Sequence, residues 1–148
     1  MIPLYGEPTD FNSFTYLSQF LQADAMKIAI EAHRIHRDRC MGTLFWQLND
    51  CWVGPSWSVI DGNGRLKPAY YAVQKAYAPL SVMLWPTTDS LSIYLVSDEL
   101  QDRMGVLSVQ VKPVQLHNSA IPPHLLPSWH FNVGSVHQES QKTFQKSL

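Results

Sequence analysis

MGTLFWQLNDCWVGPSWSVIDGNGRLK, residues 41–67, is the stretch that indicates the fold of this chain most directly. Residues 42–48 are apolar and aromatic, which is typical of a buried β-strand. A loop rich in aromatic and polar residues follows, and it ends in the turn sequence at residues 61–64. Three of the five tryptophans lie in this stretch. A strand with an aromatic, polar loop at its end is what a sugar site on a barrel rim would require.

Helical patterns lie on both sides of this stretch. Apolar residues recur at helical spacing over residues 14–37, and Asn12 and Ser13 are plausible N-terminal caps. Pro68 fits the first turn of a second helix over residues 68–77. The order helix, strand, loop, helix is typical of an α/β barrel or a doubly wound sheet.

The pattern changes after residue 78, where strands follow one another without helices. The expected strands are residues 80–85, 91–96 and 105–111. Consecutive strands suggest the start of a β-sandwich, but three strands cannot close one. The signal fades from residue 112, where prolines interrupt it. We therefore expect an α/β part in residues 1–78 and an incomplete β part with an irregular tail in residues 79–148.

Composition limits the partners and the chemistry. The net charge of −1 gives no electrostatic reason to expect nucleic acid or an anionic membrane as a partner. No apolar run is long enough to cross a bilayer, and the first residues lack the features of a signal peptide, which leaves the compartment open. No phosphate-binding glycine motif is present, and we expect no cofactor.

The two cysteines and the neighbouring histidines are candidates for a disulfide or a metal site. Cys40 and Cys51 flank the predicted strand, which would hold them roughly 20 Å apart, so we expect free thiols. His33, His36 and Cys40 continue one helix face, and all are possible zinc ligands. A fourth ligand is not evident, and histidine is expected near a helix C-terminus on dipole grounds. We therefore predict no metal site.

Four residues are candidates for binding a sugar. Trp46, Asn49 and Asp50 lie toward the C-terminal end of the predicted strand, where barrel enzymes place their active sites. An indole offers a flat apolar face to the CH groups of a sugar ring, and Trp57 in the loop could line the same groove. The alternative is that Trp46 fills the core, Asn49 and Asp50 cap a turn, and Trp57 packs the loop. From residue physics alone this structural interpretation is the simpler one.

A pair of catalytic carboxylates is not evident. Most glycosidases use two, about 5–5.5 Å apart in retaining enzymes. The glutamates are Glu7, Glu31, Glu99 and Glu139. Glu31 lies within the predicted helix, Glu99 in a loop of the β part and Glu139 in the polar tail, and no complete predicted strand precedes Glu7. Asp50 is the one acid well placed at a strand end, so we assign no catalytic residue.

The quoted stretch resembles β-mannosidases of glycoside hydrolase family 2. The resemblance rests on GTLFWQLNDCW at residues 42–52 and PSWS at residues 55–58, supported by residues 16–34, 70–79 and 94–98. It implies a retaining exo-acting hydrolase that releases β-linked mannose, with a β-mannoside oligosaccharide or a glycoprotein-derived glycan as substrate.

The resemblance also implies a place in a larger fold. Residues 1–78 would be the last part of a (β/α)8 TIM barrel, with its eighth strand, and residues 79–148 the start of an immunoglobulin-like β-sandwich. The catalytic glutamates would lie upstream, so the isolated chain would be inactive and would need the rest of the barrel. Trp46 matches the tryptophan that lines the sugar subsite, and Asn49 and Asp50 match the polar end of the strand.

Two other functions stay open. A β-galactosidase or β-glucuronidase of the same family would share the strand and loop, although the sequence of residues 47–58 argues against these two activities. A non-catalytic carbohydrate-binding or interaction module would keep the tryptophans without the chemistry. The sequence departs from the family at Val53-Gly54 and at Leu66, and no clear match extends beyond Val111.

Overall fold

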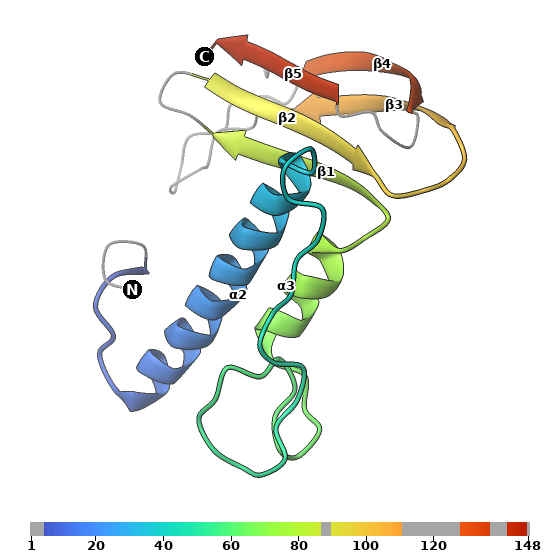
Figure 1. The fold of residues 1–148 in the computed structure, drawn as a ribbon. Helices are drawn as coiled ribbons and strands as arrows, with labels where there is room; N and C mark the ends of the chain where they lie inside the picture. The colour runs from blue at the N-terminus through green and yellow to red at the C-terminus, as the bar shows by residue number, and fades with distance from the viewer. Residues whose placement is uncertain (1–4, 87–89, 111–127, 137–141, 148) are drawn as a thin grey trace. The chain divides into compact units, whose positions relative to one another are not determined.

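The structure is a computed structural model that describes residues 5–86, 90–110, 128–136 and 142–147. The chain forms two compact units, Met1–Val96 with Gln141–Leu148 and Ser97–Ser140. Within the described residues, the first unit holds helices α2 and α3 and a three-stranded sheet, and the second holds a two-stranded sheet (Figure 1). The predicted order of helices first and strands afterwards is confirmed.

Helix α2 spans Phe11–Ile35, and a reciprocal capping box starts it. The Asp10 carboxylate accepts a hydrogen bond from the Ser13 N–H at 2.7 Å, and the Ser13 hydroxyl accepts one from the Asp10 N–H at 3.0 Å. Two backbone donors that the helix leaves unpaired are satisfied in this way. The predicted caps at Asn12 and Ser13 were therefore wrong: Asp10 is the cap, and Ser13 is the third helical residue.

Helix α3 spans Pro68–Ala76 and packs against α2. Pro68 is in the first turn, as predicted, because its missing N–H would have no helical partner there. The buried apolar cluster between the helices consists of Ala23, Ile30, Val59, Ala69, Val73 and Ala76. Three of these residues are alanines, whose small side chains allow two helices to approach closely. Neither α2 nor α3, the helices within the described residues, combines the length and apolar character needed to cross a bilayer.

The three-stranded sheet has the order β1-β2-β5. Its strands are β1 (Leu80–Pro86), β2 (Ser90–Ser97) and β5 (Lys142–Ser147). Strand β2 pairs antiparallel with β5, with Ile93 opposite Phe144. A second buried cluster joins the end of α2 to this sheet through Ile35, Met83 and Val96.

The second unit contains β3 (Arg103–Gln110) and β4 (Ser128–Val136), which pair antiparallel with an irregularity between Arg103 and Gly105. The expected strands that became β1, β2 and β3 are confirmed, although the last expected residue, Val111, lies outside the described residues. Strands β4 and β5 were not predicted, because prolines and polar residues hide the alternation in that part of the sequence. The predicted boundary after residue 78 stays a prediction.

The segment over residues 42–48 differs from its prediction. It is extended and runs back alongside the helices (Figure 1), but it has no ladder partner among the described residues. Pairing begins only at its end, where Asn49 forms a parallel bridge with Ile60. A strand requires hydrogen bonds from a neighbouring strand, so the predicted strand was wrong for this chain alone. The peptide bond between Trp46 and Gln47 is cis.

Candidate functional site

The extended segment has one face on the helices and one face toward solvent. Leu44, Trp46 and Leu48 are 99%, 72% and 56% exposed. The residues between them are half-buried, and Phe45 packs against the cluster between α2 and α3. The predicted alternation of side chains is therefore confirmed as far as Leu48. The buried face fixes the segment, and the exposed face presents an indole between two leucines.

Asp50, at the end of this segment, lies at the centre of a polar cluster. Its Oδ2 accepts hydrogen bonds from the hydroxyls of Ser56 and Ser58, each at 2.7 Å. The Lys67 ammonium lies 3.6 Å from the same oxygen and donates to the Ser58 hydroxyl at 2.8 Å. Gln47 donates to Oδ1 at 3.4 Å. We call Asp50, Ser56, Ser58 and Lys67 the Asp50 cluster.

The Asp50 cluster joins three parts of the chain. Asp50 ends the extended segment, the two serines lie in the following loop, and Lys67 is the N-cap residue of α3. A helix N-terminus disfavours a cation, and the Asp50 carboxylate offsets this cost for Lys67. The side chains of Asp50 and Lys67 are only 7% and 15% exposed, so solvent screens their attraction less than at the surface.

The charge state of Asp50 follows from its donors. Hydrogen bonds from Ser56 and Ser58, assisted by the nearby Lys67 ammonium, hold the pKa of the Asp50 carboxyl below its usual value of 3.8. The group is ionised at neutral pH and cannot serve there as a general acid, since it carries no proton to give. Sequence alternation predicted Asp50 on the outward face with Trp46, and the structure instead turns its carboxylate into the loop.

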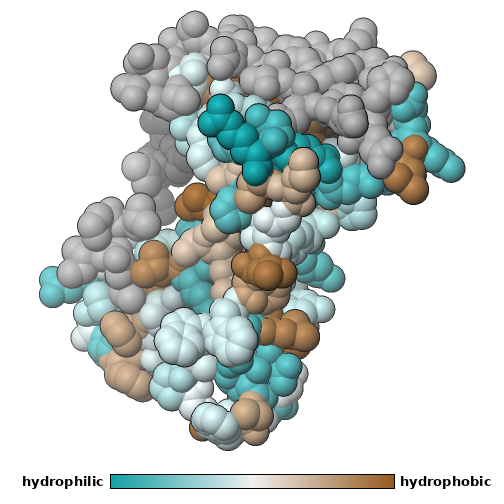
Figure 2. All heavy atoms as spheres, in the orientation of Figure 1, coloured by the Kyte–Doolittle hydropathy of each residue, from teal (hydrophilic) through white to brown (hydrophobic). Residues whose placement is uncertain are grey.

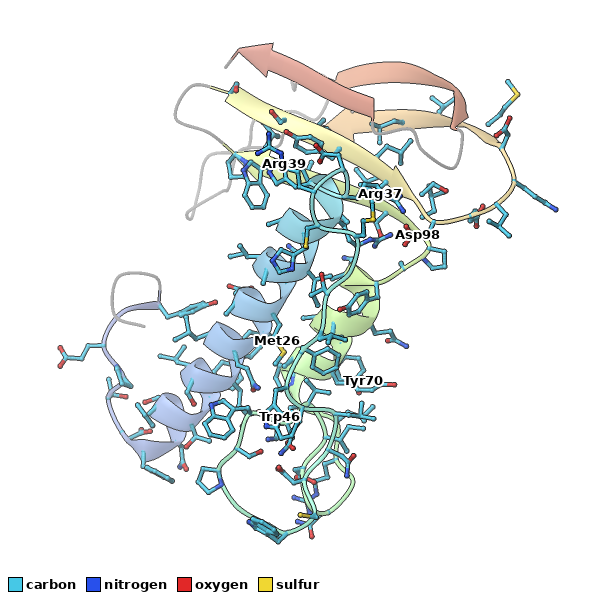
Figure 3. The ribbon with its side chains drawn as sticks, viewed as in Figure 1. Met26, Arg37, Arg39, Trp46, Tyr70 and Asp98 are labelled. Atoms are coloured by element: carbon cyan, nitrogen blue, oxygen red, sulfur yellow. The ribbon has the colours of Figure 1, made fainter. Side chains whose placement is uncertain are left out.

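Trp57 lies between the two serines of the cluster. Its indole is 70% exposed, while its backbone carbonyl accepts a hydrogen bond from the Gln22 amide of α2 at 2.8 Å. The backbone at Trp57 is thus held by the bonds of Ser56 and Ser58 to Asp50 and by the bond from Gln22 of α2. Figure 3 shows Trp46 near the end of the helix pair where this loop begins.

Known proteins resemble this chain in sequence and in fold. A beta-mannosidase from Capra hircus is 37% identical over 108 residues, which cover 68% of this chain and 12% of the relative. Beta-mannosidase A from Aspergillus clavatus is 31% identical over 144 residues, covering 91% of this chain and 15% of the relative. This chain is similar to β-mannosidases over most of its length. No protein-family model matches it.

A solved structure agrees with the sequence relatives. The crystal structure of a beta-D-mannosidase from Dictyoglomus thermophilum superposes with a TM-score of 0.64 at 28% identity. The match covers 94% of this chain and 16% of that one. The chain thus spans less than a fifth of the length of these relatives, and the predicted resemblance to β-mannosidases is confirmed. The match to the Aspergillus clavatus relative covers 91% of this chain, so it extends past Val111, where the sequence had shown no clear match.

The other predicted site residue, Asn49, is exposed, and its side-chain amide donates to the Asp50 carbonyl at 3.3 Å. Trp52 in the same loop is 75% exposed. The backbone of Trp52 lies against the turn at residues 61–64, where a Cβ on Gly62 would be 2.5 Å from the Trp52 carbonyl group. The predicted turn is confirmed: Asp61 Oδ1 accepts from two backbone N–H groups of the turn at 2.8 Å each.

The glutamates of the chain are dispersed. Glu7 is exposed at the start of the chain, and Glu31 is half-buried in the middle of α2, where desolvation raises its carboxyl pKa. Glu99 is half-buried after β2, and Glu139 lies outside the described residues. Asp50 therefore remains the acid beside Trp46 in sequence, and its carboxylate is already engaged within the loop.

One of the histidines connects α2 to the extended segment, and both cysteines are free thiols. His33 shares a hydrogen bond with the Thr43 hydroxyl at 3.0 Å, which ties α2 to the extended segment. Cys40 and Cys51 are free, as predicted. Within the described residues no three His, Cys, Asp or Glu side chains gather closely enough to hold a metal ion.

Sequence reasoning missed the Asp50 cluster. The sequence pattern predicted only a polar loop around Ser56 and Ser58, yet these two serines and Lys67 bind the carboxylate of Asp50, which was a predicted sugar ligand. The available signal was the pair of serines flanking Trp57, since hydroxyls two residues apart in a tight loop can converge on one acceptor.

Proposed function

We propose that this chain supplies one wall of the active site of a retaining β-mannosidase of glycoside hydrolase family 2. The enzyme would release terminal β-D-mannose from β-mannosides such as oligosaccharides or glycoprotein-derived glycans. The observation that carries the proposal is Trp46, an indole 72% exposed on a segment whose opposite face is anchored in the core. A large exposed indole on a fixed backbone suits stacking on the CH groups of a sugar ring.

The wider fold belongs to the same proposal. Residues 42–48 would be the eighth strand of a (β/α)8 barrel within residues 1–78, and residues 79–148 would begin an immunoglobulin-like β-sandwich. The exposure of Leu44 and Leu48 supports this interpretation, because side chains that face the interior of a barrel are uncovered when the other strands are not there.

The position of Asp50 indicates which steps this chain and the rest of the barrel would carry out. A retaining glycosidase needs an acid/base and a nucleophile on either side of the scissile bond. Asp50 is the acid nearest to Trp46 in sequence, and its ionised carboxylate is held by three neighbours of the loop. We therefore assign the chemistry to glutamates of other barrel strands and sugar binding to this chain.

An assay on an aryl β-mannoside tests the assignment. The purified chain is expected to give no turnover above buffer. Turnover that disappears when Glu7 or Asp50 is replaced would overturn it, because the catalytic acid would then lie within these residues.

A non-catalytic carbohydrate-binding module is the second candidate, and the exposure of Trp52 and Trp57 beside Trp46 in sequence favours it. Binding of mannose that is lost on Trp46→Ala, without hydrolysis by any longer form of the polypeptide, would support this candidate. A substrate panel on the longer polypeptide separates a β-mannosidase from a β-galactosidase or a β-glucuronidase.

A further inference from the structure

The loop after Asp50 combines two features. Its backbone is tied at several points, whereas its largest side chains are left in solvent. Trp52 and Trp57 are 75% and 70% exposed, and Ser58, between Trp57 and Val59, is fully buried. An exposed indole offers a flat apolar face to the CH groups of a sugar ring, and a fixed backbone keeps that face in place.

The ties converge on one atom. Asp50 Oδ2 takes hydrogen bonds from the hydroxyls on both sides of Trp57, and Lys67 approaches the same oxygen. The Ser56 hydroxyl also accepts a hydrogen bond from the Ser58 N–H at 3.1 Å, which tightens the backbone around Trp57. Moving Asp50 would therefore release the loop at the point from which Trp57 projects.

We propose that Asp50 is a positioning residue, which acts through Ser56, Ser58 and Lys67 to hold the Trp57 indole as a second aromatic contact for the glycan. The proposal rests on the proposed function for the identity of the ligand, a β-linked mannoside. It replaces the expectation that Asp50 bonds a sugar hydroxyl directly. Both acceptor oxygens of its carboxylate already have donors from the chain itself.

Ser58 separates the two roles of Asp50. Its side chain is fully buried, so it cannot touch a sugar, yet it donates to Asp50 at 2.7 Å. If Asp50 positions the loop, Ser58→Ala and Asp50→Asn affect Trp57 in the same way. If Asp50 is a direct ligand, only Asp50→Asn affects binding.

The experiment uses the full chain labelled with fluorotryptophan and followed by fluorine NMR. Each of the five tryptophan signals is assigned by a Trp→Phe substitution. Methyl β-D-mannoside and β-linked mannobiose are then titrated into the native chain and the variants. Trp85, which packs beside the cluster of Ile35, Met83 and Val96, is the internal reference for the fold. Ser18→Ala, which removes a hydroxyl that bonds within α2, is the matched control.

The expected result is a shifted or broadened Trp57 signal in Asp50→Asn and in Ser58→Ala, with the Trp85 signal unchanged. Mannoside binding should weaken about two- to tenfold in both variants, the range for loss of one aromatic contact. Ser18→Ala should change neither measurement. Ser56→Ala should reproduce the effect and Ser56→Thr, which keeps the hydroxyl, should restore it.

Two results would overturn the proposal. One is an unchanged Trp57 signal in both Asp50→Asn and Ser58→Ala. The other is loss of binding in Asp50→Asn alone, which would make Asp50 a direct ligand. If the native chain binds no mannoside but its Trp57 signal still responds to both substitutions, the proposed ligand is wrong, and the positioning role of Asp50 is supported. If Ser58→Ala shifts the Trp85 reference, the Ser56→Ala and Ser56→Thr pair decides.

Discussion

The interior between the two helices gives the sharpest prediction, because α2 carries the same residue in two environments. Ile30 is 1% exposed within the cluster between α2 and α3, whereas Ile28 is 55% exposed on the same helix. Changing either residue to alanine removes the same atoms from the same kind of backbone. Any gain in helix propensity is therefore shared, and the difference between the variants reports packing alone.

The magnitude follows from the burial. Ile30→Ala withdraws three buried carbons, which is about 2.4 kcal/mol at roughly 0.8 kcal/mol each, and the cavity left behind extends the cost to about 2–5 kcal/mol. Ile28→Ala loses less than half of that transfer term, about 1 kcal/mol, and leaves no enclosed cavity. Urea unfolding followed by far-UV circular dichroism measures both free energies of unfolding. Equal losses in the two variants would refute the assignment of Ile30 to the core.

Three further predictions concern polar and turn residues. The Asp50 pKa is lower in the folded chain than its usual value of 3.8, so the stability that the carboxylate contributes is complete above 3.8 and is lost as the pH falls through the lowered pKa. The free energy of unfolding of Asp50→Asn should therefore fall less steeply at acidic pH than that of the native chain, and an equal fall would contradict the Asp50 cluster. Gly62→Ala should lower the free energy of unfolding by about 1–3 kcal/mol, because its new Cβ would overlap the Trp52 backbone; a neutral result in urea unfolding would mean that the loop does not lie against the turn. Arg34→Met should lower the free energy of unfolding by about 1–3 kcal/mol, because the buried Ala76 carbonyl at the end of α3 loses the hydrogen bond from the Arg34 guanidinium. Arg39→Met, at a side chain 90% exposed, should change it little, and thermal unfolding compares the two variants.

Much of the secondary structure could be predicted from local pattern. Periodic apolar residues predicted α2, and Pro68 marked the start of α3. The N-cap was misplaced because Asn12 and Ser13 both favour caps, and only the geometry shows that Asp10 and Ser13 bond each other.

The extended segment shows where local pattern fails. The alternation of Leu44, Phe45 and Trp46 was correct, since it depends only on the backbone being extended. The strand itself was not, because a strand is defined by a ladder with a neighbouring strand, and residues 42–48 form no ladder among the described residues. The carbonyls of Gln47 and Leu48 accept isolated backbone hydrogen bonds from Val59 and Ile60. The alternation was also wrong at Asp50, where hydrogen bonds from the loop outweigh the period of the preceding residues.

The candidate site was predictable in part. Trp46 and Trp57 could be proposed as sugar contacts because an indole at a strand end or in the loop after it can stack on a sugar ring, and both side chains are exposed in the structure. The role of Asp50 could not be predicted, since it depends on residues 6, 8 and 17 positions later converging on one carboxylate. Long-range convergence of this kind leaves no periodic trace in a sequence.

We propose that this chain contributes a sugar-binding wall, while other strands supply the catalytic carboxylates. Hydrolysis of an aryl β-mannoside tests this proposal, measured for the purified chain and for a longer polypeptide that adds the proposed remaining barrel strands. We expect no turnover by the chain alone, and turnover by the longer polypeptide that falls on Trp46→Ala. Turnover by the chain alone that is abolished by Asp50→Asn, or a longer polypeptide whose activity is indifferent to Trp46→Ala, would contradict it.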